Sequence, residues 1–213
     1  MHKPAYSHIV KIRENYAYLI LMYQGETVKL RRLELEDADI LLEHWNEYQV
    51  RQYFPNPLPK TRKEIQDFIS SRNDGFAGRY VFTFGIEDKT TRKLVGFIDV
   101  SNINWISGTG MVDNLVIFDK SNRGKGYGKD AMLVLLDFTF NILGLHNIYL
   151  FVYKFNQHAI SFYEKIGFQR LGFLREGAYI NGKRDDVAIM DIIKSEFVQR
   201  YGILPKGDTA NSR

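Results

Sequence analysis

The sequence predicts one α/β domain (α+β mixed) in which helices flank a mixed β-sheet, and three observations support this. The chain has 213 residues, which suffices for one hydrophobic core but is short for two domains. Its contents of 45% hydrophobic and 25% charged residues are ordinary for a globular protein. From residue 27 onward, segments with the period of strands alternate with segments with the period of helices.

The first half of the domain is predicted to contain a strand, two helices and then three strands. Residues 28–33 have the pattern of a strand, and in residues 36–48 apolar side chains recur every three or four positions, as in a helix. Three prolines within residues 55–59 predict a loop. The second helix begins after Thr61, which forms a capping box with Glu64. The three strands are expected at residues 80–86, 94–104 and 112–118.

The second half is predicted to alternate helices with strands. A glycine-rich loop precedes a long amphipathic helix, and the apolar residues 147–153 follow as a buried strand. Residues 157–166 predict a helix that ends at Gly167. The last two strands, joined by an Asn-Gly hairpin turn, are expected at residues 168–175 and 186–192.

The two ends of the chain are predicted to lie outside this domain, which spans residues 27–200. Residues 1–26 form an N-terminal extension: either a strand or hairpin, able to serve a homodimer, or residues that precede a true start at Met22. The apolar run in residues 16–23 is shorter than the roughly 20 residues of a membrane helix and lacks a signal-peptide cleavage pattern. Residues 201–213 predict a flexible tail.

Composition narrows the classes of function. The chain has no cysteine, which excludes disulfides, thiolate nucleophiles and cysteine-ligated zinc. The net charge of +4 suits an anionic ligand, but the cations are spread along the chain, which argues against nucleic-acid binding. With no membrane segment in the sequence, we expect a soluble, cytoplasmic protein.

The segment from Arg123 to Lys129 has the features of a pyrophosphate site. It joins a predicted strand to a predicted helix, so that glycine amides and a helix N-terminus can face an anion. Arg123, Lys125 and Lys129 add positive charges. The P-loop pattern fails because Asp130 follows Lys129, and the dinucleotide fingerprint fails because its third glycine would fall on Lys129. A plain glycine-rich turn that starts a helix is the alternative.

Two motifs resemble the GNAT superfamily of N-acetyltransferases. Residues 123–128, Arg-Gly-Lys-Gly-Tyr-Gly, are similar to its coenzyme A loop, and residues 156–168 are similar to its N-x-x-A-x-x-x-Y-x-x-x-G-F signature. The resemblance covers roughly residues 27–194 and is closest to the branch of the ribosomal-protein N-terminal and spermidine acetyltransferases. It implies a twisted, mostly antiparallel mixed sheet that splays apart between residues 112–118 and 147–153.

The resemblance also implies acetyl-CoA as co-substrate, without a metal, and a set of residues that bind it. Main-chain groups of Val116, Ile117 and Phe118 would pair with the pantetheine, and the Asn156 side chain would bond it. Asn is also a favoured helix N-cap, which is the alternative role of Asn156. The residues expected at the pyrophosphate are Arg123, Gly124, Lys125, Gly126, Tyr127, Gly128 and Lys129.

Acetyl transfer to an amine requires a neutral amine, a stabilised oxyanion and a protonated leaving thiolate. Tyr163 is the expected proton donor, since a phenol has a pKa of about 10, and core packing is its alternative role. The Phe118 amide is the expected oxyanion donor. Asp113 is the expected base, directly or through a water chain, at a place where the family often has a longer glutamate.

His146 is a further candidate base, although its position suits a surface turn. Glu176 and Asp186 are either anchors for a cationic substrate or ordinary hairpin charges. The substrate pocket is expected to involve Trp45, Tyr53 and Phe54, for which core packing is the alternative, and the helical spacing of Trp45 favours packing.

These residues predict an N-acetyltransferase that acetylates a primary amine by direct transfer. The acceptor is a protein N-terminus or a polyamine-like small amine. Two other classes of function stay open: a sensor that binds acyl-CoA without turnover, and a nucleic-acid-binding protein.

Overall fold

The computed structural model describes residues 23–51, 58–73, 80–122, 124–180 and 182–202. The predictions for residues 1–22, for Tyr53 and Phe54, for Arg123 and for the tail from residue 203 lie outside these ranges. No helix within them is long and apolar enough to cross a membrane.

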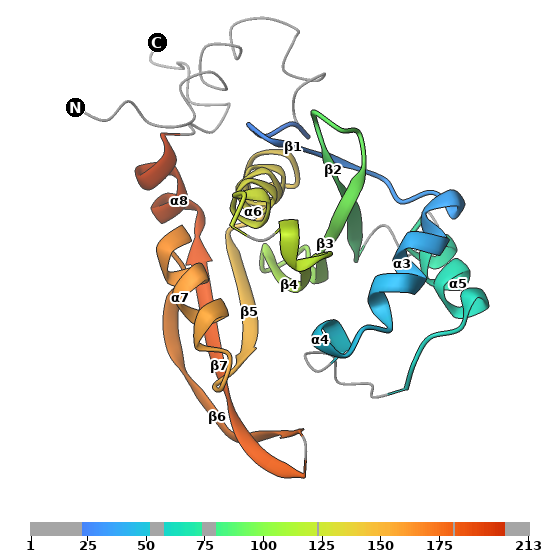
Figure 1. Ribbon diagram of the computed structural model, residues 1–213. Coiled ribbons are helices and arrows are strands. Elements are labelled where there is room, and N and C mark those ends of the chain that lie inside the picture. Colours follow the sequence, from blue (N-terminus) through green and yellow to red (C-terminus); the bar gives the residue numbers. More distant parts are fainter. Residues whose placement is uncertain (1–22, 52–57, 74–79, 123, 181, 203–213) are drawn as a thin grey trace, which may run out of the picture.

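Within the described residues, seven strands form one sheet in the order β1-β2-β3-β4-β5-β7-β6 (Figure 1). All neighbouring strands are antiparallel except β4 and β5, which are parallel. The predicted mixed, mostly antiparallel sheet is therefore confirmed. The strands are β1 (Val28–Arg31), β2 (Phe82–Asp88), β3 (Leu94–Asn104), β4 (Thr109–Ile117), β5 (Asn147–Tyr153), β6 (Gln169–Ile180) and β7 (Lys183–Ile193).

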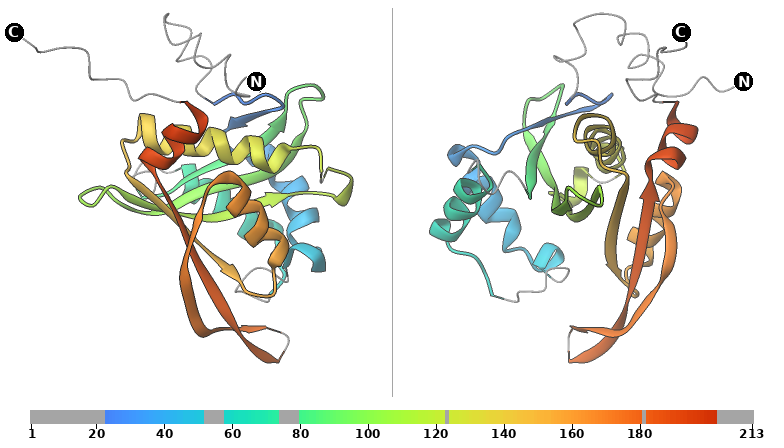
Figure 2. Two further views of the ribbon diagram at one scale, coloured as in Figure 1. Left: turned by 90° about the vertical axis from the view of Figure 1, so that its left-hand side faces the viewer. Right: turned by 180° about the vertical axis from the view of Figure 1, so that it is seen from behind.

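Helices cover both faces of this sheet (Figure 2). One face carries the larger core, which contains side chains of α6 (Tyr127–Asp137), the π-helical turn η4 (Phe138–Ile142), α7 (Gln157–Ile166) and α8 (Lys194–Tyr201). The other face packs against α3 (Ala38–Trp45) and α5 (Arg62–Asn73) around Phe97 of β3. The short elements are η1 (Leu35–Asp37), α4 (Tyr48–Arg51) and η3 (Lys120–Asn122).

Two helical predictions differ from the structure. The helix predicted at residues 36–48 is divided into η1, α3 and α4. Helix α3 ends before Asn46, whose side chain bonds Lys60. Its amide donates to the Lys60 carbonyl at 2.8 Å and accepts from the Lys60 N–H at 2.7 Å. No element was predicted for residues 194–201, which form α8. This helix is short and mostly polar, with Phe197, Val198 and Tyr201 as its only apolar residues, so its sequence gives a weak signal.

Strands β4 and β5 pair only at their first residues. The parallel register joins Thr109 to Asn147 and ends at Met111, beyond which β4 stays with β3 and β5 stays with β7. A β-bulge lies on β4 at this point, where Asp99 of β3 faces two residues of β4. The sheet therefore opens between β4 and β5, which confirms the predicted splay.

A buried carboxylate ties the beginning of the described chain to α6. Asp130 accepts hydrogen bonds from the main-chain N–H groups of Glu26, Thr27 and Val28, at 3.0, 2.7 and 2.9 Å, and from the Thr27 hydroxyl at 2.9 Å. The Tyr23 ring packs against the larger core. Residues 23–26, which the sequence assigned to the extension, thus pack on the domain.

Replacing Asp130 by Ala should lower the free energy of unfolding by about 3 kcal/mol, because it leaves several partly or fully buried donors without an acceptor. Urea denaturation at pH 7.5 measures this change, provided that the slope of the transition stays constant. Asp67→Ala is the control, since Asp67 pairs with Lys63 on the exposed surface of α5 and should cost less than about 1 kcal/mol. Equal losses in the two variants would contradict the prediction.

Candidate active site

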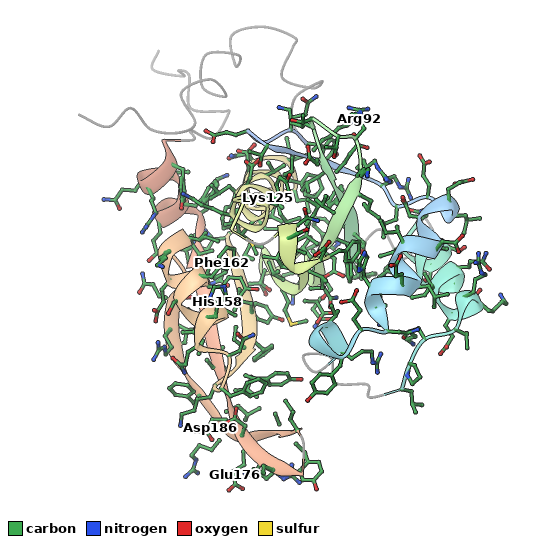
Figure 3. The ribbon with its side chains drawn as sticks, viewed as in Figure 1. Arg92, Lys125, His158, Phe162, Glu176 and Asp186 are labelled. Carbon is green, nitrogen blue, oxygen red and sulfur yellow. The ribbon has the colours of Figure 1, made fainter. Side chains whose placement is uncertain are left out.

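A cleft of about 450 Å³ occupies the gap between β4 and β5. Helix α7 lies along one side and contributes His158 and Phe162 to its lining (Figure 3). Val50 of α4 and Val187 of β7 also line it. It is a concave site on the open edges of two strands, as small-molecule sites commonly are. The cleft brings together these residues of the expected site: Asp113, Val116, Ile117, Gly128, Asn156 and Tyr163.

The main-chain amide of Phe118 is not free to bind a ligand. It donates to the carbonyl of Val95, in β3, at 2.8 Å. The Phe118 ring is buried and stacks on His44, with 4.7 Å between ring centroids. The structure therefore corrects the expectation that this amide holds the oxyanion or pairs with the pantetheine.

Two other residues of β4 offer their main-chain groups to the cleft. Successive N–H groups of a strand point to opposite edges, and those of Asn114 and Phe118 both point to β3. Val116 lies two residues from each of them, so its N–H and C=O groups also point to β3. Only the main-chain groups of its two neighbours point to the open edge. Leu115 and Ile117 are those neighbours, and a pantetheine amide can pair with them as an added strand would.

The glycine loop presents a helix N-terminus to solvent. Gly124 and Gly126 have φ angles of 79° and 88°, and a Cβ at either position would meet no atom within 4 Å. Gly126 is the N-cap of α6 and no side chain of the described residues caps the helix, so its first N–H groups remain available to an anion. Lys125 and Lys129 are exposed beside the loop. This geometry fits a pyrophosphate.

The Tyr127 side chain is part of the core. It is 8% exposed, and its hydroxyl donates to the carboxylate of Asp88 at the turn between β2 and β3. That hydrogen bond raises the pKa of the Tyr127 phenol. The same carboxylate accepts from the N–H groups of Thr90 and Thr91. Tyr127 can therefore contribute only main-chain groups to a phosphate site.

Asn156 caps α7 with one half of its amide. Its Oδ1 accepts from the N–H of Ala159 at 3.2 Å, so the cap role is confirmed. Its Nδ2 has no hydrogen-bond partner among the described residues, and the residue lines the cleft. The same side chain can thus cap the helix and donate to a ligand.

Tyr163 lines the cleft two turns further along α7. Its half-buried ring packs edge-on against Phe162 and Phe168, with centroids 5.1 and 5.6 Å away. No described residue forms a hydrogen bond with its hydroxyl. Burial raises the pKa of this phenol to about 12, so it stays neutral throughout the physiological range. A neutral donor beside the cleft suits the protonation of a leaving thiolate.

Asp113 is exposed on the β4 bulge and lines the cleft. The other candidate base and the two candidate anchors for a cationic substrate lie elsewhere. His146 is exposed next to β5 and does not line the cleft. Asp186 and Glu176 belong to the β6–β7 hairpin (Figure 3), where Asp186 accepts from Lys154 at 2.9 Å and from the Glu176 N–H at 3.0 Å.

Trp45 belongs to the second core. It stacks on Phe97 with 5.2 Å between ring centroids and does not line the cleft, as its helical spacing suggested. Sequence reasoning missed several residues that do line it. These are Val50, Asn114, Leu115, Phe151, Val152, Tyr153, His158, Ala159, Phe162 and Val187.

Comparisons with known proteins agree with this geometry. Residues 27–169 match the family model described as an acetyltransferase (GNAT) domain. Spermidine N(1)-acetyltransferase of Vibrio cholerae serotype O1 is 30% identical over 172 residues, which cover 80% of this chain and 95% of that protein. The Escherichia coli K12 spermidine N(1)-acetyltransferase is 26% identical over 188 residues, with coverages of 84% and 93%.

Solved structures give the same result. The crystal structure of spermidine N-acetyltransferase from Vibrio cholerae in complex with CoA and spermine superposes on this chain with a TM-score of 0.73. The two are 29% identical in sequence, and the match covers 82% of this chain and 99% of the other.

Proposed function

The chain belongs to the GNAT acetyltransferase family and is an acetyl-CoA-dependent N-acetyltransferase, and we propose that its acceptor is a polyamine of the spermidine class. The likeness to a spermidine acetyltransferase over 80% of the chain is the observation that carries this acceptor. The similar structure with CoA and spermine bound supports it.

The cleft has the chemistry that a polyamine requires. A polyamine carries several ammonium groups, and the exposed carboxylate of Asp113 lies in the cleft wall. Phe151 lines the same cleft with 50% of its surface exposed. An exposed aromatic ring can hold an ammonium group over its face, worth about 0.5–1 kcal/mol at such a site.

The residues of the cleft can then be assigned to the successive steps of acetyl transfer. Acetyl-CoA supplies a thioester, whose carbonyl carbon the amine attacks. Asp113 takes the proton that the acceptor ammonium loses, directly or through water, so that the nitrogen is neutral when the N–C bond forms. The open main chain of Leu115 and Ile117 can hold the carbonyl oxygen. Tyr163 gives its proton to the sulfur as the C–S bond breaks, and the new amide nitrogen gives up its second proton to the Tyr163 phenolate, directly or through water. Asp113 returns its proton to solvent, so one proton is released in each turnover.

Spermidine should be acetylated with a kcat/KM at least about 100-fold above that of a peptide with a free N-terminus, because only a polyamine places a second ammonium group near the acidic and aromatic wall. Release of the CoA thiol with a panel of both acceptor types measures this. Preference for the peptide would contradict the polyamine proposal and make the chain a protein N-terminal acetyltransferase. Acetyl-CoA binding in calorimetry without thiol release from any acceptor would support a sensor instead.

A further inference from the structure

A carboxyl group with no exposed surface lies directly behind the cleft wall. Asp99, on β3, is 0% exposed. It occupies the register position that faces Asp113 and Asn114 across the β4 bulge. Buried carboxyls are rare unless they are bonded to partners, and the steps given above use neither Asp99 nor the Asn114 side chain.

Asn114 connects this buried carboxyl to the one in the cleft. Its main-chain N–H donates to one oxygen of Asp99 at 2.9 Å, and its Nδ2 donates to the other at 3.0 Å. The same Nδ2 lies 3.4 Å from Oδ2 of Asp113. Both carboxylate oxygens of Asp99 thus accept from Asn114. They orient the Asn114 side-chain amide so that it also reaches the Asp113 carboxylate.

The groups around Asp99 make its charge sensitive to pH. Burial is the largest cause of its raised pKa, which is about 6, and the Asp113 charge raises it further. Donation from Asn114 and the charge of Arg72, on α5, lower the pKa. From β2, the register partner Thr83 is uncharged, and its buried hydroxyl has no hydrogen-bond partner among the described residues.

We propose that Asp99 is a positioning residue for acetyl transfer, which holds the Asn114 side chain and through it the Asp113 carboxylate that faces the acceptor amine. This inference rests on the role proposed for Asp113. The edge of β4 that serves acetyl-CoA is formed by other residues, Leu115 and Ile117. Asp99 therefore affects the KM for the acceptor amine and leaves the Kd of acetyl-CoA unchanged.

The ionised form of Asp99 is the one that holds Asn114. An ionised carboxylate accepts at both oxygens, whereas a protonated one turns an acceptor into a donor that faces an N–H group. One of the two bonds from Asn114 is then lost and its amide is released. The KM for the acceptor consequently rises as the pH falls through about 6.

Replacing Asp99 by Asn should raise the acceptor KM about tenfold, the scale of one lost hydrogen bond to a charged group, and leave the acetyl-CoA Kd unchanged. The new Nδ2 cannot accept from Asn114, and because asparagine has nearly the size and shape of aspartate, the variant should fold. Asn114→Ala should have the same effect. The double variant should be no worse than either single one, because both act through one contact.

Asp137→Asn is the matched control. Asp137 is also a buried carboxyl that accepts from an asparagine, Asn141, at 2.6 Å, but it lies on α6 and does not line the cleft. Its replacement should leave the acceptor KM unchanged. Spermidine is the probe, or the peptide if the unaltered chain uses that acceptor, so the test does not depend on the polyamine proposal.

NMR of the Asn114 side-chain amide gives a readout that needs no acceptor. Its resonances should shift with a midpoint near pH 6 in the unaltered chain and lose that transition in Asp99→Asn. An unchanged acceptor KM in both single variants would overturn the proposal. So would an equal rise of the acceptor KM and the acetyl-CoA Kd, which indicates general loosening, or an Asn114 transition that survives the Asp99 substitution.

Discussion

Tyr163→Phe should lower kcat for acetyl transfer at least about 100-fold, the lower range for loss of a general acid or base, while acetyl-CoA binds as tightly as before. The substitution removes only a hydroxyl that has no hydrogen-bond partner among the described residues. The ring contacts with Phe162 and Phe168 remain. Single-turnover thiol release measures the chemical step, and calorimetry measures the binding.

Tyr201→Phe is the control for this variant. It removes a hydroxyl that donates to the carbonyl of Ile166, the last residue of the same helix, at 2.8 Å. It should leave kcat within about twofold, because surface and structural changes away from the reacting atoms do not remove a proton donor. A Tyr163 variant as active as this control would contradict the assigned role and restore the core-packing alternative.

The pH dependence gives a second test of Tyr163. The active form is the neutral phenol, which is present below its pKa and lost as the pH rises through about 12. No loss of kcat from this residue is therefore expected below about pH 11 in the unaltered chain. An alkaline limb near pH 10 that disappears in Tyr163→Phe would show that the phenol has its ordinary pKa and that burial does not raise it.

Elements bounded by strong local signals could be predicted from the sequence. The strands Leu94–Asn104 and Asn147–Tyr153 and the helix Gln157–Ile166 have the predicted bounds. The capping box before α5 is also present, with the Thr61 N–H donating to Glu64 at 2.8 Å and the Glu64 N–H donating to the Thr61 hydroxyl at 3.2 Å. Helix α8 was missed because it is short and mostly polar, so that Phe197, Val198 and Tyr201 give only a weak helical signal.

The site required information that is not local. Which amides of β4 face the cleft depends on the bulge opposite Asp99, which shifts the phase of the strand and is not visible in its alternation. Of the three residues predicted to pair with the pantetheine, Ile117 points its main-chain groups to the open edge, whereas Val116 and Phe118 point theirs to β3. Tyr127 presented a similar difficulty, since its bond to Asp88 joins segments 39 residues apart.

Gly126→Asp should weaken CoA binding about 100-fold or more, whereas Gly126→Asn should weaken it about tenfold or less. The two side chains have nearly the same shape, and either points into space that no atom fills within 4 Å. They differ by one negative charge at the site expected to hold the pyrophosphate. Two unit charges at 4 Å repel by about 1 kcal/mol in water and about 4 kcal/mol near a protein surface, and 1.4 kcal/mol corresponds to tenfold.

The order of the same two variants in stability should be the reverse of their order in CoA affinity. Both new side chains require the φ of 88° found at Gly126, which costs a residue with a Cβ about 1–2 kcal/mol. Only the aspartate adds a charge that the N-terminus of α6 attracts, by about 0.3–1 kcal/mol. The Gly126→Asp variant should therefore unfold at a higher urea concentration than the Gly126→Asn variant while binding CoA more weakly. If the less stable variant were also the one that binds CoA more weakly, the substitutions would lower CoA affinity by destabilising the loop and not by repelling the phosphates.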